Sequence, residues 1–477
     1  MKPVHGSLLD SSRRIYLSGI GGVGMSGLAK LLQHRGFEVA GSDRVESRSV
    51  RELKSLGISV YVGQKEDFLQ PCDLFVYSSA IQKDHPEMIW AQRKNLPILH
   101  RAEALASVFN LSETSVAITG THGKTTTSSM IAYVLSETGR HPTCLVGGDI
   151  ANLGTNAILG GNSFFVSEVD ESDGSQVCFT PNYSVLTNLE EDHMDHYMDL
   201  ENLKQSMAQF ISNMTNPGLV VYSLEDPVLR ELVPASGKPH LSFGWSPQAD
   251  IYAEKIRLQG FHSEFDLFHG GFFQGRVLLS VPGAHNILNA MGAMAVLLEL
   301  GLDFDEIAEA LFRFRGARRR LEVKLDLDHL MVIDDYAHHP AEVRASLRAL
   351  KNLGRRLTVV FQPHRFSRTQ YLGRDFGKVF KEANEVILTE IYGAGEKNPD
   401  NVSSDLIYRA VREENHPDVK MVAKTEVIDY LLARNTQDQG EVIAFLGAGD
   451  IGDVAEEFSR RVKTLRETNP LARQLVS

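Results

Sequence analysis

The sequence has little or none of several features that would mark particular classes of protein. Its 477 residues include only three cysteines, Cys72, Cys144 and Cys178, and they lack the spacing of a metal site or a CxxC motif. We therefore expect reduced thiols and a cytoplasmic protein. No apolar run reaches about 18 residues, and no apolar signal core precedes the first expected strand, so neither a membrane span nor export is predicted. The absence of short repeats and low-complexity runs disfavours a solenoid or a linker.

Basic residues are fewer than acidic ones: the chain has 49 lysines and arginines and 61 aspartates and glutamates, which give a formal net charge of −12. This balance argues against a nucleic-acid-binding protein, and any anionic substrate must be held by local cationic groups. What is present is typical of soluble globular chains, with 43% hydrophobic and 23% charged residues. At about 150 residues per domain, the length predicts roughly three domains.

The most informative stretch is SVAITGTHGKTTT, residues 115–127. An apolar strand followed by Gly120 and Gly123 predicts a loop whose backbone N–H groups close on a polyphosphate at the start of a helix. Lys124 supplies positive charge there, and the Thr125 hydroxyl is placed to ligate Mg²⁺. The glycines are two residues apart rather than the four of the usual Walker form. The alternative is a glycine-rich helix start without a ligand.

A second glycine turn lies near the N-terminus, where RIYLS, GIGGVGMSGLAKLLQHRG and FEVAGSD read as strand, helix and strand. Gly19, Gly21 and Gly24 fit GxGxxG, and Asp43 follows about twenty residues later, where a dinucleotide fold places its ribose-binding acid. This pattern fits an NAD site, another nucleotide-diphosphate site or a tight turn equally well.

Further strands predict three α/β segments along the chain. SFFVSEVD and YSVLTNL belong to the second segment, which then passes through a variable stretch, HSEFDLFHGGFFQGRVLLSVPG. LMVIDDY, RLTVVFQP, EVILTE and EVIAFLG predict the strands of the third segment, from about Leu321.

Several polar clusters follow these strands, where α/β folds assemble their sites. Glu168 ends one strand, and His193 lies in NLEEDHMDHY after the next, so both could join Thr125 around Mg²⁺; the alternative is a solvated acidic loop. Asn289 in GAHNILNA could recognise adenine, and the arginines of RRRLE could reach a phosphoryl group. VIDDYAHHP and FQPHRFSRTQ place histidine, tyrosine and arginine after two more strands. These side chains could bind a carboxylate or a diphosphate. The alternative is that they cap helices or lie on the surface without a ligand.

Together, GTHGKTTT, DHMDHY, GAHNILNA, RRRLE, VIDDYAHHP and FQPHRFSR resemble the Mur ligase family of ATP-dependent amide-bond-forming enzymes of peptidoglycan synthesis, over nearly the whole chain. The resemblance implies an α/β protein of three domains. A Rossmann-like domain at 1–108 would bind a UDP-sugar, a central P-loop ATPase-type domain at 109–320 with a mostly parallel sheet would bind ATP, and a Rossmann-like domain at 321–477 would contact the amino acid and ATP.

GIGGVGMSGLA, VYSSAI, DDYAHHP and FQPHRFSRT are most similar to members that join L-alanine to UDP-N-acetylmuramate. The resemblance, not the spacing, supplies these substrates, together with ATP and Mg²⁺, and a monomer or weak homodimer is expected. Two rival readings remain: a sister ligase that attaches a recycled peptide or another amino acid, and a nucleotide sensor or NAD-binding protein.

The resemblance also implies a set of site residues for each role. Catalysis would fall to Lys124, His193, Arg320 and His338, and the metal would be held by Thr125, Glu168 and His193. ATP would be bound by Gly120, Thr121, His122, Gly123, Lys124, Thr125, Thr126, Asn289, Arg320 and Asp335. The UDP-sugar would contact Gly19, Gly21, Gly22, Gly24 and Asp43, and the muramate and amino acid would contact Tyr336, His338, Arg365 and Arg368.

Overall fold

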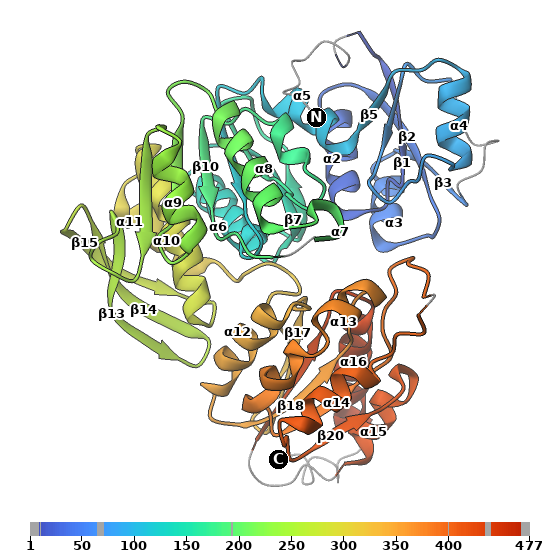
Figure 1. Cartoon of the computed structure of the whole chain (residues 1–477), viewed down its shortest axis with the longest axis vertical. Coiled ribbons are helices and arrows are strands. Elements are labelled where there is room, and N and C mark those ends of the chain that lie inside the picture. The colour runs from blue at the N-terminus through green and yellow to red at the C-terminus, as the bar shows by residue number, and fades with distance from the viewer. Residues whose placement is uncertain are drawn as a thin grey trace. The chain divides into compact units, whose positions relative to one another are not determined.

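The structure is a computed structural model that describes Leu9 and residues 11–63, 71–191, 194–398, 400–434 and 440–468 (Figure 1). The chain divides into two compact units. The first comprises Met1–Ile256, Phe265–Leu278 and Ile287–Arg315, and the second comprises Arg257–Glu264, Leu279–Asn286 and Gly316–Ser477. Two short stretches from the middle of the sequence are therefore part of the unit that holds the C-terminal third.

The first sheet is a five-stranded parallel sheet with the order β3-β2-β1-β4-β5. Its strands are β1 (Arg14–Ser18), β2 (Glu38–Asp43), β3 (Ser59–Val62), β4 (Leu74–Tyr77) and β5 (Ile98–His100), and its helices are α2 (Val23–His34), α3 (Arg48–Ser55), α4 (Pro86–Arg93) and α5 (Arg101–Phe109). The strand order reverses between β1 and β4, and such a switch point opens a crevice beyond the carboxyl ends of the strands.

The second sheet has ten strands in the order β15-β14-β13-β12-β11-β10-β6-β9-β7-β8. Its strands are β6 (Thr114–Thr119), β7 (Thr143–Ile150), β8 (Thr155–Ile158), β9 (Phe164–Glu168), β10 (Tyr183–Leu186), β11 (Leu219–Ser223), β12 (His240–Gly244), β13 (Ile251–Gln259), β14 (His262–His269) and β15 (Phe272–Leu279). Its helices are α6 (Lys124–Glu137), η2 (Ser175–Cys178), α7 (Met194–Tyr197), α8 (Leu200–Asn213), α9 (Pro227–Ala235), α10 (Ala284–Glu299) and α11 (Phe304–Arg313). The strands from β12 to β7 in this order pair in parallel, and β8 pairs antiparallel to β7.

The third sheet has six strands in the order β16-β17-β21-β18-β19-β20, and only the pairing of β16 with β17 is antiparallel. Its strands are β16 (Glu322–Asp326), β17 (Leu330–Asp335), β18 (Arg356–Phe361), β19 (Glu385–Leu388), β20 (Val419–Met421) and β21 (Glu441–Leu446). Its helices are α12 (Pro340–Lys351), α13 (Phe366–Leu372), η3 (Asp375–Glu382), α14 (Asp405–Glu413), η4 (Lys424–Glu426), α15 (Val427–Ala433) and α16 (Ile451–Thr468).

Both faces of the third sheet are buried, as the continuous apolar strands predict. Val359 and Phe361 of β18 join a core with Leu347 of α12 on one face, whereas Val360 joins Phe458 of α16 on the other. Side chains that alternate along a strand point to opposite faces, so a strand covered on both sides is mainly apolar along its length. The predicted α/β class with mostly parallel sheets in three regions is confirmed.

Part of the middle of the chain completes the second unit. Phe261, in the turn between β13 and β14, packs against the core that contains Leu350 of α12. A Cβ on Gly283 would lie 3.1 Å from the Ala349 side chain. The core beside α12 thus depends on residues from well before the third sheet.

Charged side chains are buried at the amino-terminal ends of strands in the third sheet. Glu385 begins β19 and Glu441 begins β21, and both are 3% exposed at the side chain. Arg434, which follows α15, pairs with Glu385 and lies 3.1 Å from Glu441. Lys420 lies 3.1 Å from Glu385, and the Tyr430 hydroxyl donates to the same carboxylate at 2.7 Å. These ion pairs hold α15 and three strands together.

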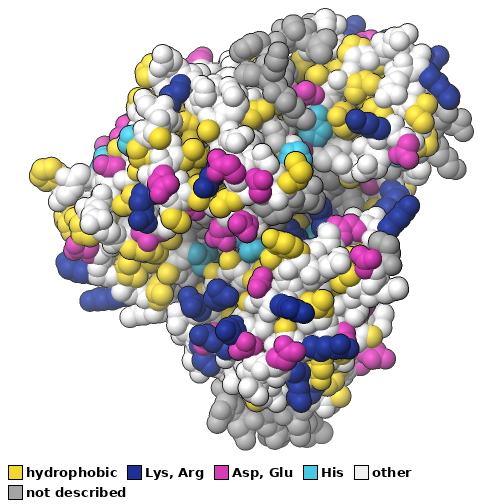
Figure 2. Space-filling view, in the orientation of Figure 1, with side chains coloured by type: hydrophobic (Ala, Val, Ile, Leu, Met, Phe, Trp, Pro, Cys, Tyr) yellow, Lys and Arg dark blue, Asp and Glu magenta, His cyan; other side chains and the backbone are white. Residues whose placement is uncertain are grey.

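Figure 2 shows acidic and basic side chains interspersed over the face in view. This arrangement agrees with the acidic net charge, and it leaves anion binding to local groups. None of the described helices has both the length and the apolar character needed to cross a membrane.

Candidate functional site

The predicted phosphate loop lies between the end of β6 and the start of α6. Gly120 and Gly123 have φ angles of 125° and 87°, which L side chains rarely adopt. A Cβ on Gly120 would come within 2.4 Å of the Thr187 hydroxyl oxygen and 2.6 Å of the Asn188 carbonyl oxygen. The turn after β6 therefore requires glycine and packs closely on the residues that follow β10.

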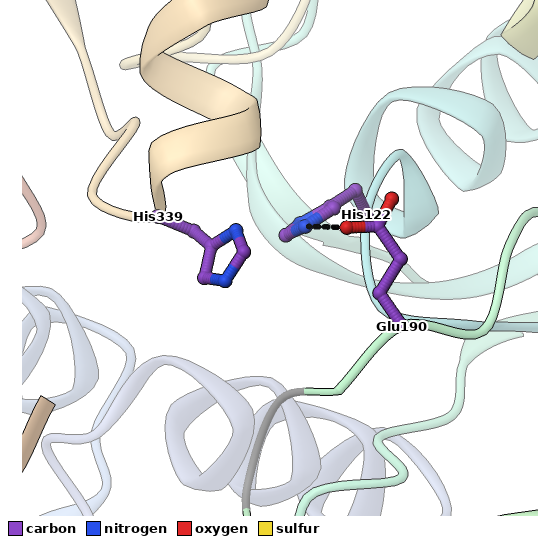
Figure 3. A group of neighbouring side chains, drawn as sticks. All are labelled: His122, Glu190 and His339. Carbon is purple, nitrogen blue, oxygen red and sulfur yellow. Dashed lines mark ion pairs between the residues drawn. The ribbon is translucent and has the colours of Figure 1, made fainter. Parts of the chain in front are cut away.

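Hydrogen bonds fix the backbone of this loop. The His122 N–H donates to Asn188 Oδ1 at 2.8 Å, and Asn188 Nδ2 and Thr187 Oγ1 donate to the His122 carbonyl oxygen at 3.0 and 2.6 Å. The Glu190 N–H donates to Thr121 Oγ1 at 2.9 Å. Glu190 also pairs with the His122 side chain at 3.7 Å, as the dashed line in Figure 3 shows. A loop held in this way is pre-organised, so binding a phosphate costs little ordering.

Lys124 is the first residue of α6, and its side chain is tied to an acidic partner. Its Nζ lies 3.0 and 2.9 Å from the two carboxylate oxygens of Glu171, and it donates to the Gly120 carbonyl oxygen at 2.5 Å. Burial alone would lower the pKa of Lys124, but the carboxylates of Glu171, Asp170 and Glu168 raise it above the ordinary value. Lys124 is therefore a cation at neutral pH. Burial raises the pKa of Glu171 to about 7 against the opposing pull of Lys124.

Thr125 and Glu168 meet beside this pair. The Thr125 hydroxyl donates to a Glu168 carboxylate oxygen at 2.8 Å, and the Gly147 N–H of β7 donates to the same oxygen at 2.9 Å. Two oxygen donors on adjacent elements suit Mg²⁺, which prefers oxygen ligands and takes few of them from the protein. These residues fit the predicted ion. His193, predicted as a further ligand, lies outside the described residues.

Asn289, predicted to meet adenine, is brought to the loop by α10. A Cβ on Gly123 would lie only 2.5 Å from Asn289 Oδ1, so the two residues are in direct proximity. Asn289 and Thr126 are each 8% exposed. The structure thus gathers Thr121, His122, Lys124 and Asn289 around one loop although α10 is distant in the sequence.

The glycines predicted to bind the UDP-sugar form the turn between β1 and α2. The Gly21 N–H donates to Asp43 Oδ2 at 2.9 Å, and Gly22 is the residue that precedes α2. A Cβ on Gly24 would lie 2.9 Å from an Arg101 guanidinium nitrogen, and one on Gly19 would lie 2.9 Å from the Ser78 hydroxyl oxygen. The turn is bounded by β2, β4 and α5, and it lies beyond the carboxyl ends of the strands, where the strand order reverses between β1 and β4.

In the second unit, Tyr336 follows β17 and has two arginines near its ring. The guanidinium carbons of Arg319 and Arg320 lie 5.1 and 5.3 Å from the centre of its ring, which is the range of cation–π contacts. Arg320 also lies 3.9 Å from Glu342 of α12. Arg319 was not among the predicted site residues, and its Nε lies 3.4 Å from the buried Asp334 carboxylate.

His338 connects this group to the residues after β18. Its ring lies 5.4 Å from that of Tyr336 and 5.5 Å from that of His364, between ring centres. An Arg368 guanidinium nitrogen lies 3.2 Å from His364 Nδ1, and the His364 ring stacks on Tyr392 at 5.8 Å. Tyr336, His338, His364 and Arg368 therefore form one chain of contacts beyond the carboxyl ends of β17 and β18, which pair in parallel with β21 on its two sides.

Two predicted residues of this unit are held differently. Asp335 is 3% exposed, accepts a hydrogen bond from the Ser346 hydroxyl and has a raised pKa because it is buried. Arg365 has a φ of 68° and a side chain that is 41% exposed, 3.9 Å from Glu396. Asp335 is thus engaged within the fold, whereas Arg365 presents its guanidinium at the surface of this unit.

We expect His364 to remain neutral throughout the physiological pH range. Burial, followed by the nearby His338 and Arg368, lowers its pKa to about 3. Nuclear magnetic resonance of ¹⁵N-labelled histidine should show no protonation of this ring between pH 8 and pH 5. Arg368→Met should raise the His364 pKa because it removes one of the positive charges. A transition above pH 5 in the unaltered protein would contradict the expectation.

The comparisons with known proteins cover nearly the whole chain. Residues 14–112 match the model of the Mur ligase family, catalytic domain, residues 118–297 match the Mur ligase middle domain, and residues 319–449 match the Mur ligase glutamate ligase domain. The UDP-N-acetylmuramate–L-alanine ligase of Trichlorobacter lovleyi is 41% identical over 453 residues, which cover 94% of this chain and 99% of that protein.

Other relatives agree. The UDP-N-acetylmuramate–L-alanine ligase of Aquifex aeolicus is 40% identical over 95% of this chain and 99% of its own length. The crystal structure of UDP-N-acetylmuramate–alanine ligase from Thermotoga maritima superposes with a TM-score of 0.82 at 30% identity, over 95% of this chain and 99% of that one. Sequence, fold and loop geometry confirm the predicted resemblance: the chain belongs to the Mur ligase family.

Proposed function

We propose that this protein is an ATP-dependent ligase that joins L-alanine to the carboxylate of UDP-N-acetylmuramate, releasing ADP and phosphate, in peptidoglycan synthesis. The observation that carries this proposal is the loop after β6, in which partly buried Lys124 and the Thr125–Glu168 pair converge between β6 and β9. Relatives of that named activity match almost the full length of the chain, which supports the choice of substrates. We further propose a cytoplasmic location, and a monomer or weak homodimer.

The roles of the three parts follow from their sites. We propose that residues 1–108 hold the UDP-sugar at the crevice of the first sheet, that 109–320 bind ATP, and that 321–477 contact the amino acid and ATP. The diphosphate would lie at the Gly19–Gly24 turn, where backbone N–H groups and the start of α2 favour an anion. Asp43 would face the ribose.

The residues of the ATP site divide the work between them. We propose that Gly120, Thr121, His122, Gly123 and Thr126 surround the polyphosphate, and that Asn289, Asp335 and Arg320 contact the nucleoside and the phosphates. Thr125 and Glu168, with His193, would hold Mg²⁺, which neutralises phosphate charge when it is bound. Tyr336, His338, Arg365 and Arg368 would orient the muramate carboxylate and the alanine.

The chemistry proceeds in two steps. A carboxylate is a poor acceptor for an amine, so an oxygen of the muramate carboxylate first attacks the γ-phosphorus of ATP, and ADP leaves. The amine of alanine then attacks the carbonyl carbon of the acyl phosphate, and the C–O bond to phosphate breaks. Lys124 and Arg320 would stabilise the charge on the transferring phosphoryl group, since such transfer depends on positioning and electrostatics.

The function is tested by phosphate release with a panel of acceptors. With ATP and Mg²⁺ present, we expect turnover only when UDP-N-acetylmuramate and L-alanine are both added. Glycine, L-serine and a tripeptide should each react more slowly than L-alanine. A higher kcat/KM with the tripeptide would favour a sister ligase, and stabilisation by NAD without phosphate release would contradict the proposal.

A further inference from the structure

Three polar side chains outside the proposed substrate contacts meet between the first two sheets. Ser79 follows β4, His100 ends β5, and Asp173 lies in the segment after β9. Ser79 Oγ lies 2.9 Å from His100 Nε2 and 2.8 Å from Asp173 Oδ2, and His100 Nε2 lies 3.5 Å from the same carboxylate oxygen. All three belong to the first compact unit.

The donors and acceptors among these three groups can be assigned from the backbone contact of His100. His100 Nδ1 accepts from the Ala102 N–H at 3.4 Å because His100 caps the start of α5. In a neutral ring the hydrogen then lies on Nε2, and burial, the largest effect on this ring, lowers the pKa of His100 and favours that neutral form. His100 therefore donates to Ser79, and the Ser79 hydroxyl donates to Asp173. This direction differs from that of a serine nucleophile, which donates its proton to histidine.

Asp173 belongs to a short acidic segment, residues 168–173, whose side chains contact other elements of the first unit. Glu168 accepts from Thr125, Glu171 pairs with Lys124, and Asp173 accepts from Ser79. The other Asp173 oxygen accepts from the Ser175 N–H at 3.1 Å, which fixes the end of the segment at η2. Asp173 thus lies on the same six-residue segment as the partners of Lys124 and Thr125.

The opposite end of this chain of hydrogen bonds lies at the crevice of the first sheet. Ser79 comes directly after Ser78, whose hydroxyl would lie 2.9 Å from a Cβ on Gly19. Ser79 is exposed, whereas His100 is 4% exposed. Ser79 thus lies next to the turn where we place the UDP-sugar, and the buried imidazole of His100 hydrogen bonds to its hydroxyl.

We propose that Ser79, His100 and Asp173 form a link that positions the acidic segment 168–173 and couples UDP-sugar occupancy of the crevice to the affinity of the phosphate loop for ATP. The inference deepens the proposed function and rests on it. Ser79 and Asp173 act as positioning residues, because they reach the phosphates only through Glu171 and Glu168.

The test compares Ser79→Ala and Asp173→Asn with the unaltered protein. In Asp173→Asn the amide oxygen can still accept from Ser175, but the amide nitrogen faces Ser79, so the hydroxyl hydrogen loses its acceptor. Calorimetry would measure the Kd of a non-hydrolysable ATP analogue with Mg²⁺, with and without saturating UDP-N-acetylmuramate. We expect the UDP-sugar to tighten analogue binding by about 5-fold or more in the unaltered protein, and by less than about 2-fold in both variants.

Turnover and controls make the test specific. We expect kcat to fall about 10- to 100-fold, since small misplacements of catalytic groups have effects of that size, while the Kd for UDP-N-acetylmuramate alone stays unchanged. Ser79→Thr keeps the hydroxyl at an exposed position and should restore both kcat and coupling. Asp305→Asn, an exposed carboxylate on α11, should behave as the unaltered protein.

Each other result has a definite meaning. The link would be overturned if Asp173→Asn left both the coupling and kcat unchanged. It would also be overturned if Ser79→Thr lost as much coupling as Ser79→Ala, or if the unaltered protein showed no coupling between the two ligands. Absence of phosphate release from the unaltered protein would instead contradict the proposed function. If Ser79→Ala fails to fold, the pair Asp173→Asn and Ser79→Thr decides the question.

Discussion

Replacing Lys124 with methionine should lower phosphate release by about 10³-fold or more, because the variant removes a partly buried cation from the position where we propose that charge develops on the transferring phosphoryl group. The expected loss appears in kcat, measured with saturating ATP, UDP-N-acetylmuramate and L-alanine. The affinity for UDP-N-acetylmuramate should change less than about 2-fold, since the crevice of the first sheet does not contain Lys124. Alanine-dependent ADP release at the normal rate would contradict this prediction.

The Lys124→Met experiment needs a control for Glu171, which loses its partner in that variant. Its side chain is 1% exposed, so Lys124→Met leaves a buried carboxyl without its cation, and the loss of attraction raises the Glu171 pKa above about 7. The single variant is therefore expected to be less stable at pH 8 than at pH 6, because ionised Glu171 is unpaired. Lys124→Met combined with Glu171→Gln removes both charges and should recover stability without recovering turnover. Lys378→Met, at a 75% exposed position, is the matched control.

Arg434→Met should destabilise the third sheet by about 3 kcal/mol. It removes the closer and more buried of two arginines that bridge Glu385 and Glu441, and it leaves half-exposed Arg356 at 3.4 and 3.8 Å from these carboxylates. The quantity to measure is the free energy of opening of β19 and β21 from amide hydrogen exchange, since one global unfolding midpoint is poorly defined for a chain of several domains. Arg409→Met, at a 75% exposed ion pair, should change it by less than about 1 kcal/mol. Equal protection of β21 in the two variants would contradict the prediction.

The pH dependence of this effect has a definite sign. Burial alone would raise the pKa of Glu385, but the hydrogen bond from Tyr430 and the charges of Arg434 and Lys420 lower it overall. A carboxylate with a lowered pKa stabilises the native state above its unfolded pKa, and this stabilisation is lost as pH falls through the folded value. The difference between Arg434→Met and the unaltered protein should therefore shrink below about pH 4.

The sheets could be predicted because strands covered on both faces leave continuous apolar runs in the sequence. SFFVSE, LMVIDD and EVIAFL, for example, became β9, β17 and β21. The stretch after residue 261 was harder, because buried Asp266 interrupts the apolar pattern and is balanced by Lys255 and Arg276, each 2.9 Å away. Its turn signal was nevertheless present: Gly270 and Gly271 both have positive φ, as two-residue hairpin turns require.

The candidate site was predictable to the extent that it is local in the sequence. The loop from Gly120 to Thr125 combines its glycines, lysine and hydroxyl within six residues. Glycine backbone N–H groups and a lysine can bind phosphate, and a threonine hydroxyl can ligate Mg²⁺. The pairing of Lys124 with Glu171 spans 47 residues, and that of Ser79 with Asp173 spans 94. Nothing in the spacing of such residues reveals contacts that the packing of separate strands creates, so they required the structure.

The interleaving of the two compact units bears on how the protein can be divided in the laboratory. A fragment starting at Gly316 would retain all six strands of the third sheet but would lack Phe261 and Gly283, which pack beside α12. The Leu350 and Ala349 side chains of this fragment would then be exposed to solvent. Because of this exposed apolar surface, the fragment should aggregate when it is expressed alone. Residues 257–264 and 279–286 would have to be grafted back through short artificial linkers to give a well-behaved sample.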